Sequence, residues 1–217
     1  MTDYLAGGRR VGDVPRTTAA TGAPAVVRVV ARRSGPPAAW WGMLMLIASE
    51  GVLFAAFIGT FFYLRFNDPT WPPKGDPEPK VIVPLIMVAV LTTTSPLLQG
   101  AWRAAREGRL FATRALIFVA LVVQSGYFAY EVTDFGHELQ KSPISSDAYT
   151  SAHYVLLGAD HAHVFVGILF DLWLLWKLST GLTTYRANAL QAITLYTHFV
   201  VILTWAVIGA ILSAAVG

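Results

Sequence analysis

An all-α integral membrane bundle of five transmembrane helices is the fold class that this sequence predicts. Hydrophobic residues make up 55% of the 217 residues and charged residues only 13%, about half the share usual in a soluble domain. Five apolar runs follow one another, each close to the ~20 residues that a membrane-spanning helix needs. Two of the connectors are short, which makes the helices on either side of them antiparallel neighbours.

The chain is expected to have two parts. Residues 1–37 are rich in Gly, Pro, Ala, Thr and Arg and contain no long apolar run, so they predict a flexible basic cytoplasmic tail. A short membrane-surface helix over residues 26–33 is an alternative for part of this tail. Residues 38–217 form the predicted five-helix transmembrane domain. The sequence contains no cysteine, which excludes disulfides, copper–thiolate sites and iron–sulfur sites in this chain.

The five expected helices cover approximately residues 40–63, 82–102, 113–132, 154–177 and 190–215. The first connector is rich in proline and predicts an extended surface loop. The third connector, residues 133–151, is polar and is also interpreted as a loop. Twelve of the 16 Lys and Arg residues fall on one side of this topology, so the N-terminus is predicted to be cytoplasmic and the C-terminus to lie on the outer face.

The first span contains one ionisable residue, Glu50, about 15 Å from its start and thus near the midplane of a ~30 Å hydrocarbon core. A carboxyl group at that depth should face protein or a water-filled cavity and have a partner. A structural hydrogen bond, a proton-relay role and contact with a lipid headgroup are all open interpretations. Gly51, Ala55 and Gly59 recur every four residues and predict a small-residue ridge for close helix packing.

The second and third spans carry polar residues with different expected roles. Pro96, in "TTTSP", lacks an N–H and crowds the carbonyl of Thr92, so we expect a kink and a helix-packing role. Neighbouring hydroxyl groups can satisfy the freed backbone groups. Gln124 is expected to form a hydrogen bond across helices. Glu131 lies near the outer end of its span, where its side chain can reach water.

The fourth span, with "GADHAHVFVGILFDLW", places Asp160, His163, Gly167 and Asp171 on one broad stripe, Gly167 being expected to serve helix packing. His161 points roughly the opposite way from His163. An H-x-H sequence on a helix splays its imidazoles, unlike the i, i+4 pair of a helical zinc site, so no metal site is predicted. Asp171 is about two turns from the cytoplasmic end and is expected to reach the interface or another helix.

The fifth span contains His198 in "LYTHFVVILTW". With Glu50 and His163 it gives three buried ionisable groups on three helices. These groups can satisfy one another only if the three helices adjoin. None of them is predicted to be catalytic.

These segments, in this order, resemble the cytochrome c oxidase subunit III family of the haem–copper terminal oxidases, in its five-helix form. "WWGMLMLIASEGVLFAAFIGTFFYLR" places Glu50 on the family's buried glutamate, and "PLIMVAVLTTTSPLLQGAWRAAREG" follows the next family helix. "YFAYEVTDF" resembles the end of a further helix and places Glu131 on its acidic residue. "SDAYTSAHYVLLGADHAHVFVG" places His163 on a family position, and "LYTHFVVILTW" does so for His198. The resemblance runs in register over approximately residues 40–215.

Three positions depart from the family pattern. Asp160 stands where the family usually has a histidine, Val201 replaces an aspartate, and Met87 replaces a frequent asparagine. The polar contacts and the lipid-headgroup chemistry that the family forms at those positions are therefore not expected unchanged.

The resemblance implies a subunit without haem or copper of its own, in a complex that reduces oxygen to water and pumps protons. Haem and copper would be in partner subunits, and phospholipid is an expected ligand. The implied partners are subunit I in direct contact, subunit II in the same complex and membrane lipids, with no nucleic acid. The implied location is a bacterial or archaeal plasma membrane, which the chain crosses several times. Glu50, Glu131, His163 and His198 are the implied functional and structural set, with Asp160 as an additional buried polar residue.

Two alternatives remain at this stage. A homologous accessory subunit of a quinol oxidase or nitric oxide reductase system would keep the fold and change the partners. A stand-alone proton-conducting bundle would need a connected polar path across the whole membrane.

Overall fold

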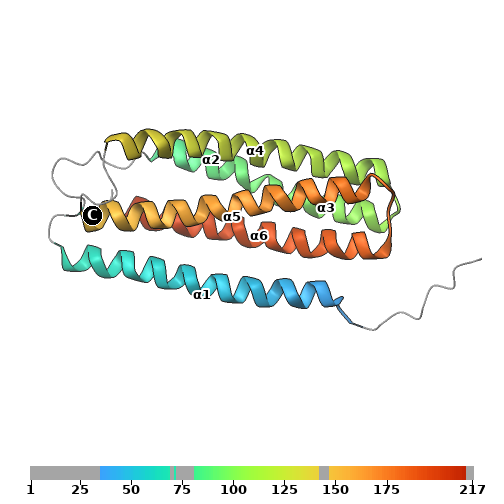
Figure 1. The fold of residues 1–217 in the computed structure, drawn as a ribbon, viewed down its shortest axis with the longest axis horizontal. Helices are drawn as coiled ribbons and strands as arrows, with labels where there is room; N and C mark the ends of the chain where they lie inside the picture. The colour runs from blue at the N-terminus through green and yellow to red at the C-terminus, as the bar shows by residue number, and fades with distance from the viewer. Residues whose placement is uncertain (1–34, 69–70, 72–80, 142–146, 214–217) are drawn as a thin grey trace, which may run out of the picture. The chain divides into compact units, whose positions relative to one another are not determined.

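The computed structural model describes residues 35–68, 71, 81–141 and 147–213, and the described part is helical throughout apart from short turns (Figure 1). The helices are α1 (Ala38–Asn67), α2 (Ile82–Thr92), α3 (Thr94–Arg106), α4 (Leu110–Lys141), α5 (Ala148–Leu178) and α6 (Thr184–Leu212). With α2 and α3 taken as one span, five helices are long and apolar enough to cross a membrane, as predicted. The predicted tail lies, up to residue 34, outside the described residues.

The helices are longer than predicted, and the largest difference corrects an expectation. Residues 133–141 belong to α4, although their polarity predicted a loop. Asp134 and Glu138 lie on the side of α4 that faces α5, where Glu138 Oε2 is 3.6 Å from His153 Nε2. Polar side chains with partners on a neighbouring helix are compatible with helical structure, so polarity alone did not mark the end of α4. The helix α5 begins where Asp147 caps it, accepting a hydrogen bond from the Thr150 N–H at 2.7 Å.

The second span is interrupted close to Pro96, where the sequence predicted a kink. The interruption is at Thr93, three residues before the proline, where the Thr93 N–H donates to the Val90 carbonyl at 3.1 Å. The hydroxyl groups of Thr92, Thr93 and Thr94 each donate to a carbonyl of the preceding turn, at 2.7–2.8 Å. The threonine hydroxyl groups therefore bond backbone carbonyls at the place where the helix is interrupted, as expected for an interrupted helix in a membrane.

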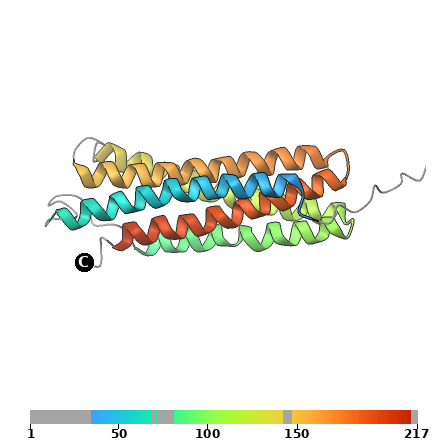
Figure 2. The same ribbon diagram turned by 90° about the horizontal axis from the view of Figure 1, so that it is seen from below.

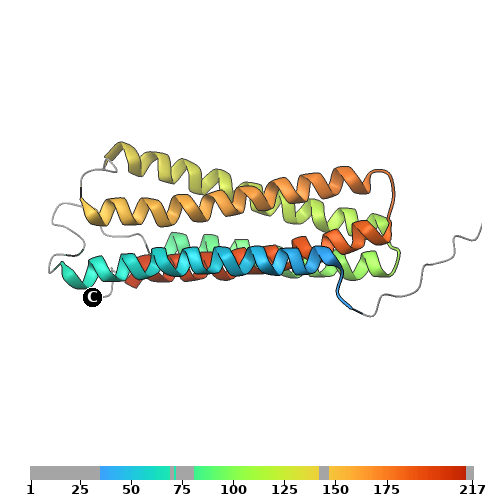
Figure 3. The same cartoon turned by 60° about the horizontal axis from the view of Figure 1, so that its bottom comes forward.

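The central helix of the bundle is α6, which packs against α1, α2, α3 and α5 (Figures 2 and 3). In contrast, the main helix contacts of α1 within the described residues are with α5 and α6, so it lies at the edge. In the most hydrophobic 18-residue window of each helix, 11% of the residues of α1 are buried and 56% of those of α6. Most of α1 is therefore left for contact with lipid or another protein.

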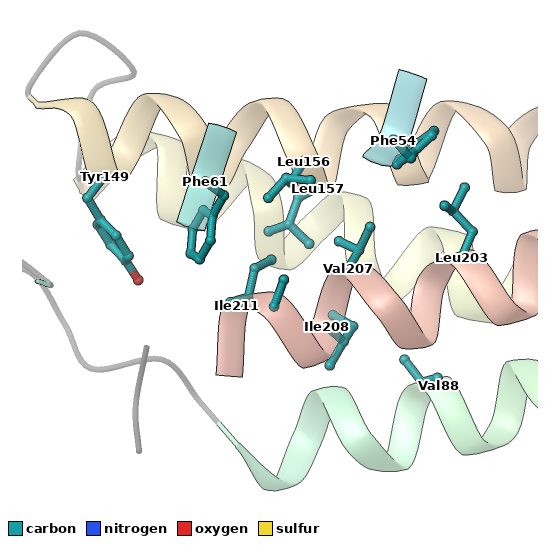
Figure 4. Packing of buried hydrophobic residues seen from close by; sticks show 11 residues of the cluster. Phe54, Phe61, Val88, Tyr149, Leu156, Leu157, Leu203, Val207, Ile208 and Ile211 are labelled. Atoms are coloured by element: carbon teal, nitrogen blue, oxygen red, sulfur yellow. The ribbon is translucent and has the colours of Figure 1, made fainter. Parts of the chain in front are cut away.

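The apolar core contains a separate cluster of buried residues at each end of the bundle. At the end where α5 begins, Phe61 of α1 packs with Leu156 of α5 and Val207 of α6 (Figure 4). At the end where α5 finishes, a second cluster joins α3, α4, α5 and α6 through residues such as Leu98 and Leu174, both fully buried. We refer to these ends as the α5 N-terminal end and the α5 C-terminal end.

Candidate functional site

The polar side chains in the middle of the bundle radiate from α5 toward three neighbouring helices. His161 approaches Glu131 of α4, with 3.5 Å between His161 Nε2 and Glu131 Oε2. His163 approaches Glu50 of α1, and Asp160 approaches α6. The predicted divergence of His161 and His163 is therefore confirmed. Asp160 and His163 lie on the same stripe of α5 but approach different helices, because the stripe is broad enough to face more than one helix.

Glu50 is paired with His163, one of the partners that we expected for it. Glu50 Oε2 lies 3.2 Å from His163 Nε2, and the two side chains are 26% and 17% exposed. The other ring nitrogen, Nδ1, lies 2.8 Å from the carbonyl oxygen of Ala159. A carbonyl oxygen can only accept a hydrogen bond, so Nδ1 carries a proton.

This tautomer determines what the contact with Glu50 must contain. A neutral His163 protonated on Nδ1 presents a bare lone pair at Nε2, which would meet the lone pairs of a carboxylate without any hydrogen between them. A hydrogen bond therefore requires one further proton, carried either by His163 as an imidazolium or by Glu50 as a carboxylic acid. In both cases the pair has no net charge, which is the inexpensive state inside a membrane.

The position of His163 is fixed from several sides. The Tyr196 hydroxyl group of α6 donates to the His163 backbone carbonyl at 3.1 Å. The ring of Phe54 meets the imidazole edge-on, with 5.0 Å between the ring centroids. The pair Glu50–His163 therefore ties α1 to the part of α5 that is already anchored on α6.

Asp160 connects α5 to α6 through one oxygen only. The Thr204 hydroxyl donates to Asp160 Oδ1 at 2.8 Å, and the aspartate is 1% exposed. Its second oxygen, Oδ2, is buried and has no hydrogen-bond partner within the described residues. Asp160 thus provides one hydrogen bond to α6 and has one acceptor without a partner among the described residues.

Glu131 turns toward a neighbouring helix and lies well inside α4, although its place in the sequence predicted a position near the end of its span. Its side chain is 12% exposed and turns toward His161. The helix α4 continues ten residues beyond it to Lys141, so Glu131 is not at a helix end. One end of the bundle thus contains two acid–imidazole pairs, because Glu138 and His153 form a second one.

Gln124, Asp171 and His198 have different surroundings. The Oε1 atom of Gln124 is buried and has no hydrogen-bond partner among the described residues. Both carboxyl oxygens of Asp171 are unpaired and the residue is 0% exposed, so it neither reaches the interface nor forms a hydrogen bond to another helix. His198 is half-buried and joins neither Glu50 nor His163.

The small residues selected for helix packing have different surroundings. A methyl group added at Gly167 would lie 3.2 Å from Gln124 Oε1, so this glycine does allow a close approach of α4. Gly51 faces α6, with Phe199 at 4.0 Å. Ala55 and Gly59 are exposed, and no described heavy atom comes within 4 Å of a methyl group added at Gly59. The chain's own described helices therefore use only the first residue of the predicted ridge.

Sequence reasoning missed Asp134, Glu138 and His153. A signal existed: Glu131 and Glu138 are seven residues apart and His153 and His161 eight, so each pair returns to one face of its helix. The loop assignment for residues 133–151 concealed this periodicity.

Comparison with known proteins identifies the family. The family model described as cytochrome c oxidase subunit III matches residues 36–210, which is most of the chain. The chain belongs to the cytochrome c oxidase subunit III family. Its relatives include a probable cytochrome c oxidase subunit 3 of Nocardia farcinica, 29% identical over 84% of this chain and 92% of the relative. A cytochrome c oxidase subunit 3 of Alkalihalophilus pseudofirmus and a quinol oxidase subunit 3 of Bacillus subtilis are each 28% identical, over 73% of this chain and 78% of the relative.

The family assignment makes this multi-pass membrane protein an accessory subunit III of a haem–copper oxidase. The imidazoles of His153, His161 and His163 lie opposite carboxyl groups of α4 and α1. Within the described residues, no three His, Asp or Glu side chains converge closely enough to hold a metal ion together.

Proposed function

We propose that this subunit performs no redox step itself and stabilises the catalytic subunit I of a proton-pumping terminal oxidase. It packs directly against subunit I in a complex that also contains subunit II. It binds phospholipid and supports proton uptake by subunit I, while haem and copper reside in the partner subunits. The observation that carries this proposal is the match of the subunit III family over residues 36–210.

The packing of the bundle supports a lateral accessory role. The edge helix α1 presents mostly exposed apolar residues, yet Glu50 and His163 tie it to α5. A helix anchored in this way forms a rigid side wall that a neighbouring subunit or ordered lipid can cover. The Glu50–His163 pair thus acts as a structural tie within that wall and takes part in no chemical step.

The charge distribution supports a cytoplasmic N-terminus in a bacterial or archaeal plasma membrane. Among the described residues, Arg65 and Lys141 lie at the α5 N-terminal end. The basic residues at the opposite end are Arg103, Arg106, Arg109, Arg114, Lys177 and Arg186. This bias supports a cytoplasmic location for the α5 C-terminal end. At that end Arg114 donates to the Leu178 carbonyl and Lys177 Nζ lies 4.7 Å from the Trp176 ring, typical of an interfacial region.

A stand-alone proton channel is disfavoured by the distribution of polar groups. The acid–imidazole pairs and Asp160 lie in the half of the bundle near the α5 N-terminal end. The other half is packed with the apolar cluster that contains Leu98 and Leu174, and Asp171 there lacks any hydrogen-bond partner among the described residues. A proton path through the described bundle would therefore be interrupted.

Purification of the tagged full-length chain from its native membrane in mild detergent tests the assignment. We expect the chain to carry with it a haem-containing subunit I, identified by its optical spectrum and by mass spectrometry. Recovery of a haem-free homo-oligomer would overturn the proposal.

The electron donor requires a separate measurement, because the relatives include subunits of both cytochrome c oxidases and quinol oxidases. Oxygen consumption by the purified complex with reduced cytochrome c, and then with a quinol, identifies the donor. Activity with reduced cytochrome c would assign the subunit to a cytochrome c oxidase, and activity with the quinol alone would assign it to a quinol oxidase. Reduction of nitric oxide by the complex would assign the subunit to a nitric oxide reductase system.

A further inference from the structure

A cavity between α4 and α5 gathers titratable side chains that the proposed function does not use. It is partly open, has a volume of about 60 Å³ and is also lined by residues of α2 and α6. Its titratable lining residues are Glu131, Asp134, Glu138, His153 and His161. A polar cavity of this size has room for more than one water.

Two imidazole nitrogens point to water as the occupant of this cavity. His153 Nδ1 and His161 Nε2 are buried and have no hydrogen-bond partner among the described residues. His161 is only 6% exposed, and its 3.5 Å separation from Glu131 Oε2 is too long for a good hydrogen bond. Buried polar atoms without a protein partner are usually satisfied by ordered water when the space is polar and large enough.

Asp160 is the buried carboxyl group next to the cavity's inner imidazole, His161. The two side chains interact electrostatically, and Asp160 Oδ2 has no hydrogen-bond partner among the described residues. The titratable groups around Asp160 are Tyr127 and Glu131 of α4, Tyr196 of α6, His161 and His163 of α5, and, beyond His163, Glu50 of α1. The helix α2 contains no titratable residue.

We propose that the α4–α5 cavity is a hydrated site that exchanges protons between the α5 N-terminal end of the bundle and the carboxyl group of Asp160. In this exchange a cavity water takes up a proton from the bulk and passes one to the free nitrogen of His161, and the imidazolium then releases the proton on its other nitrogen to the Asp160 carboxylate. The reverse transfer returns the proton to water, so no other reactant is consumed. This inference stands independently of the proposed function, since it concerns where protons equilibrate and not what the complex catalyses.

Asp171 provides a matched comparison on the same helix. It is as deeply buried as Asp160 but lies eleven residues further along α5, beside none of the cavity's lining residues. Both of its oxygens lack a hydrogen-bond partner in the described structure. The proposal therefore requires rapid proton exchange at Asp160 and slow exchange at Asp171.

Infrared difference spectroscopy of the purified native complex after a pH jump tests this contrast. The carboxylic acid bands of the two aspartates are assigned with Asp160→Asn and Asp171→Asn. We expect the Asp160 band to follow the bulk pH at least tenfold faster than the Asp171 band. A wild-type Asp160 band that never responds to pH, or that responds no faster than the Asp171 band, would overturn the proposal.

Substitution of the inner imidazole tests the route itself. We expect His161→Phe to slow the response of Asp160 at least tenfold, because phenylalanine keeps the volume and removes the proton carrier. His161→Gln, which keeps a hydrogen-bonding side chain, is expected to slow it similarly and serves if the phenylalanine variant does not assemble. His137→Gln is the control, since this imidazole is exposed on α4 and does not line the cavity. An unchanged Asp160 response in either assembled His161 variant contradicts the proposed route.

Discussion

The Glu50–His163 contact allows a prediction that separates hydrogen bonding from charge. Glu50→Ala leaves His163 Nε2 without its partner, whereas the Nδ1 contact with the Ala159 carbonyl keeps the ring in place. Loss of one interhelical hydrogen bond, with a partly buried nitrogen left unpaired, should cost about 1–2 kcal/mol of unfolding free energy. This corresponds to roughly a 5- to 30-fold change in the folding equilibrium. Glu50→Gln should cost less than about 0.5 kcal/mol, since an amide N–H can donate to the bare Nε2.

Equilibrium unfolding of the chain in mixed micelles, with increasing denaturing detergent, measures these differences. The variants Glu50→Ala, His163→Ala and the double variant form a cycle that isolates the coupling between the two side chains. The cycle is needed because His163→Ala also removes the edge-on contact with Phe54. We expect a coupling free energy of about 1–2 kcal/mol.

Two results would refute the reasoning about this pair. A coupling below about 0.3 kcal/mol would show that the contact does not stabilise the bundle. A Glu50→Gln variant as unstable as Glu50→Ala would show that the contact requires the negative charge of Glu50. In that case a hydrogen bond between the two side chains would not by itself be sufficient. In the assembled oxidase, the proposed function adds that Glu50→Ala leaves the initial rate of oxygen consumption near the wild-type value and shortens the active lifetime. Immediate loss of turnover in a correctly assembled complex would contradict that role.

Three further substitutions test the interior by the same unfolding measurement. Thr204→Val should destabilise the bundle by about 1–3 kcal/mol, because Asp160 loses the 2.8 Å hydrogen bond that it has to α6. Gly167→Ala should cost about 1 kcal/mol through the new methyl group 3.2 Å from Gln124 Oε1, and this cost should vanish in a Gln124→Ala background. Asp171→Leu should stabilise the bundle by about 1 kcal/mol or more, since it removes a buried carboxyl group without hydrogen-bond partners in the described structure.

Each of these predictions has a control or an opposing outcome. Thr197→Val is the control for Thr204, because its hydroxyl group bonds only the Ile193 carbonyl of its own helix, at 3.1 Å. Gly126→Ala is the control for Gly167 and should be close to neutral, since no described heavy atom comes within 4 Å of its added methyl group. A marked loss of stability in Asp171→Leu would mean that this carboxyl group has a partner in the folded protein.

The arrangement of spans could be predicted from the sequence because the membrane restricts the choices. An apolar run of sufficient length crosses a bilayer only as a helix or within a closed barrel, so the five runs predicted five helices directly. Pro96 predicted the interruption of the second span, since the missing N–H and the ring clash act within one helical turn. The sequence also predicted that Glu50 has a partner, because an isolated carboxyl group at that depth requires one.

Properties that depend on neighbouring helices could not be obtained in the same way. Gln124 looked suited to bond across helices, but its oxygen faces the bare backbone at Gly167. His198 shares its residue type and approximate depth with His163 but has a different rotation about its helix. A difference of about 100° per residue decides which neighbour a side chain meets, and the sequence does not state which helices adjoin.

The contrast between Asp160 and Asp171 gives the clearest physical interpretation of this interior. Both are fully buried carboxyl groups on α5, yet only Asp160 has a hydroxyl donor on the adjacent helix and imidazoles beside it. The residues around Asp160 can supply or remove a proton and stabilise either state by a hydrogen bond. Asp171 has no such neighbour in the described structure, so it is inexpensive only as the neutral acid. The α5 N-terminal half therefore gathers the groups that the proposed proton exchange uses, whereas the other half is packed mainly with apolar side chains.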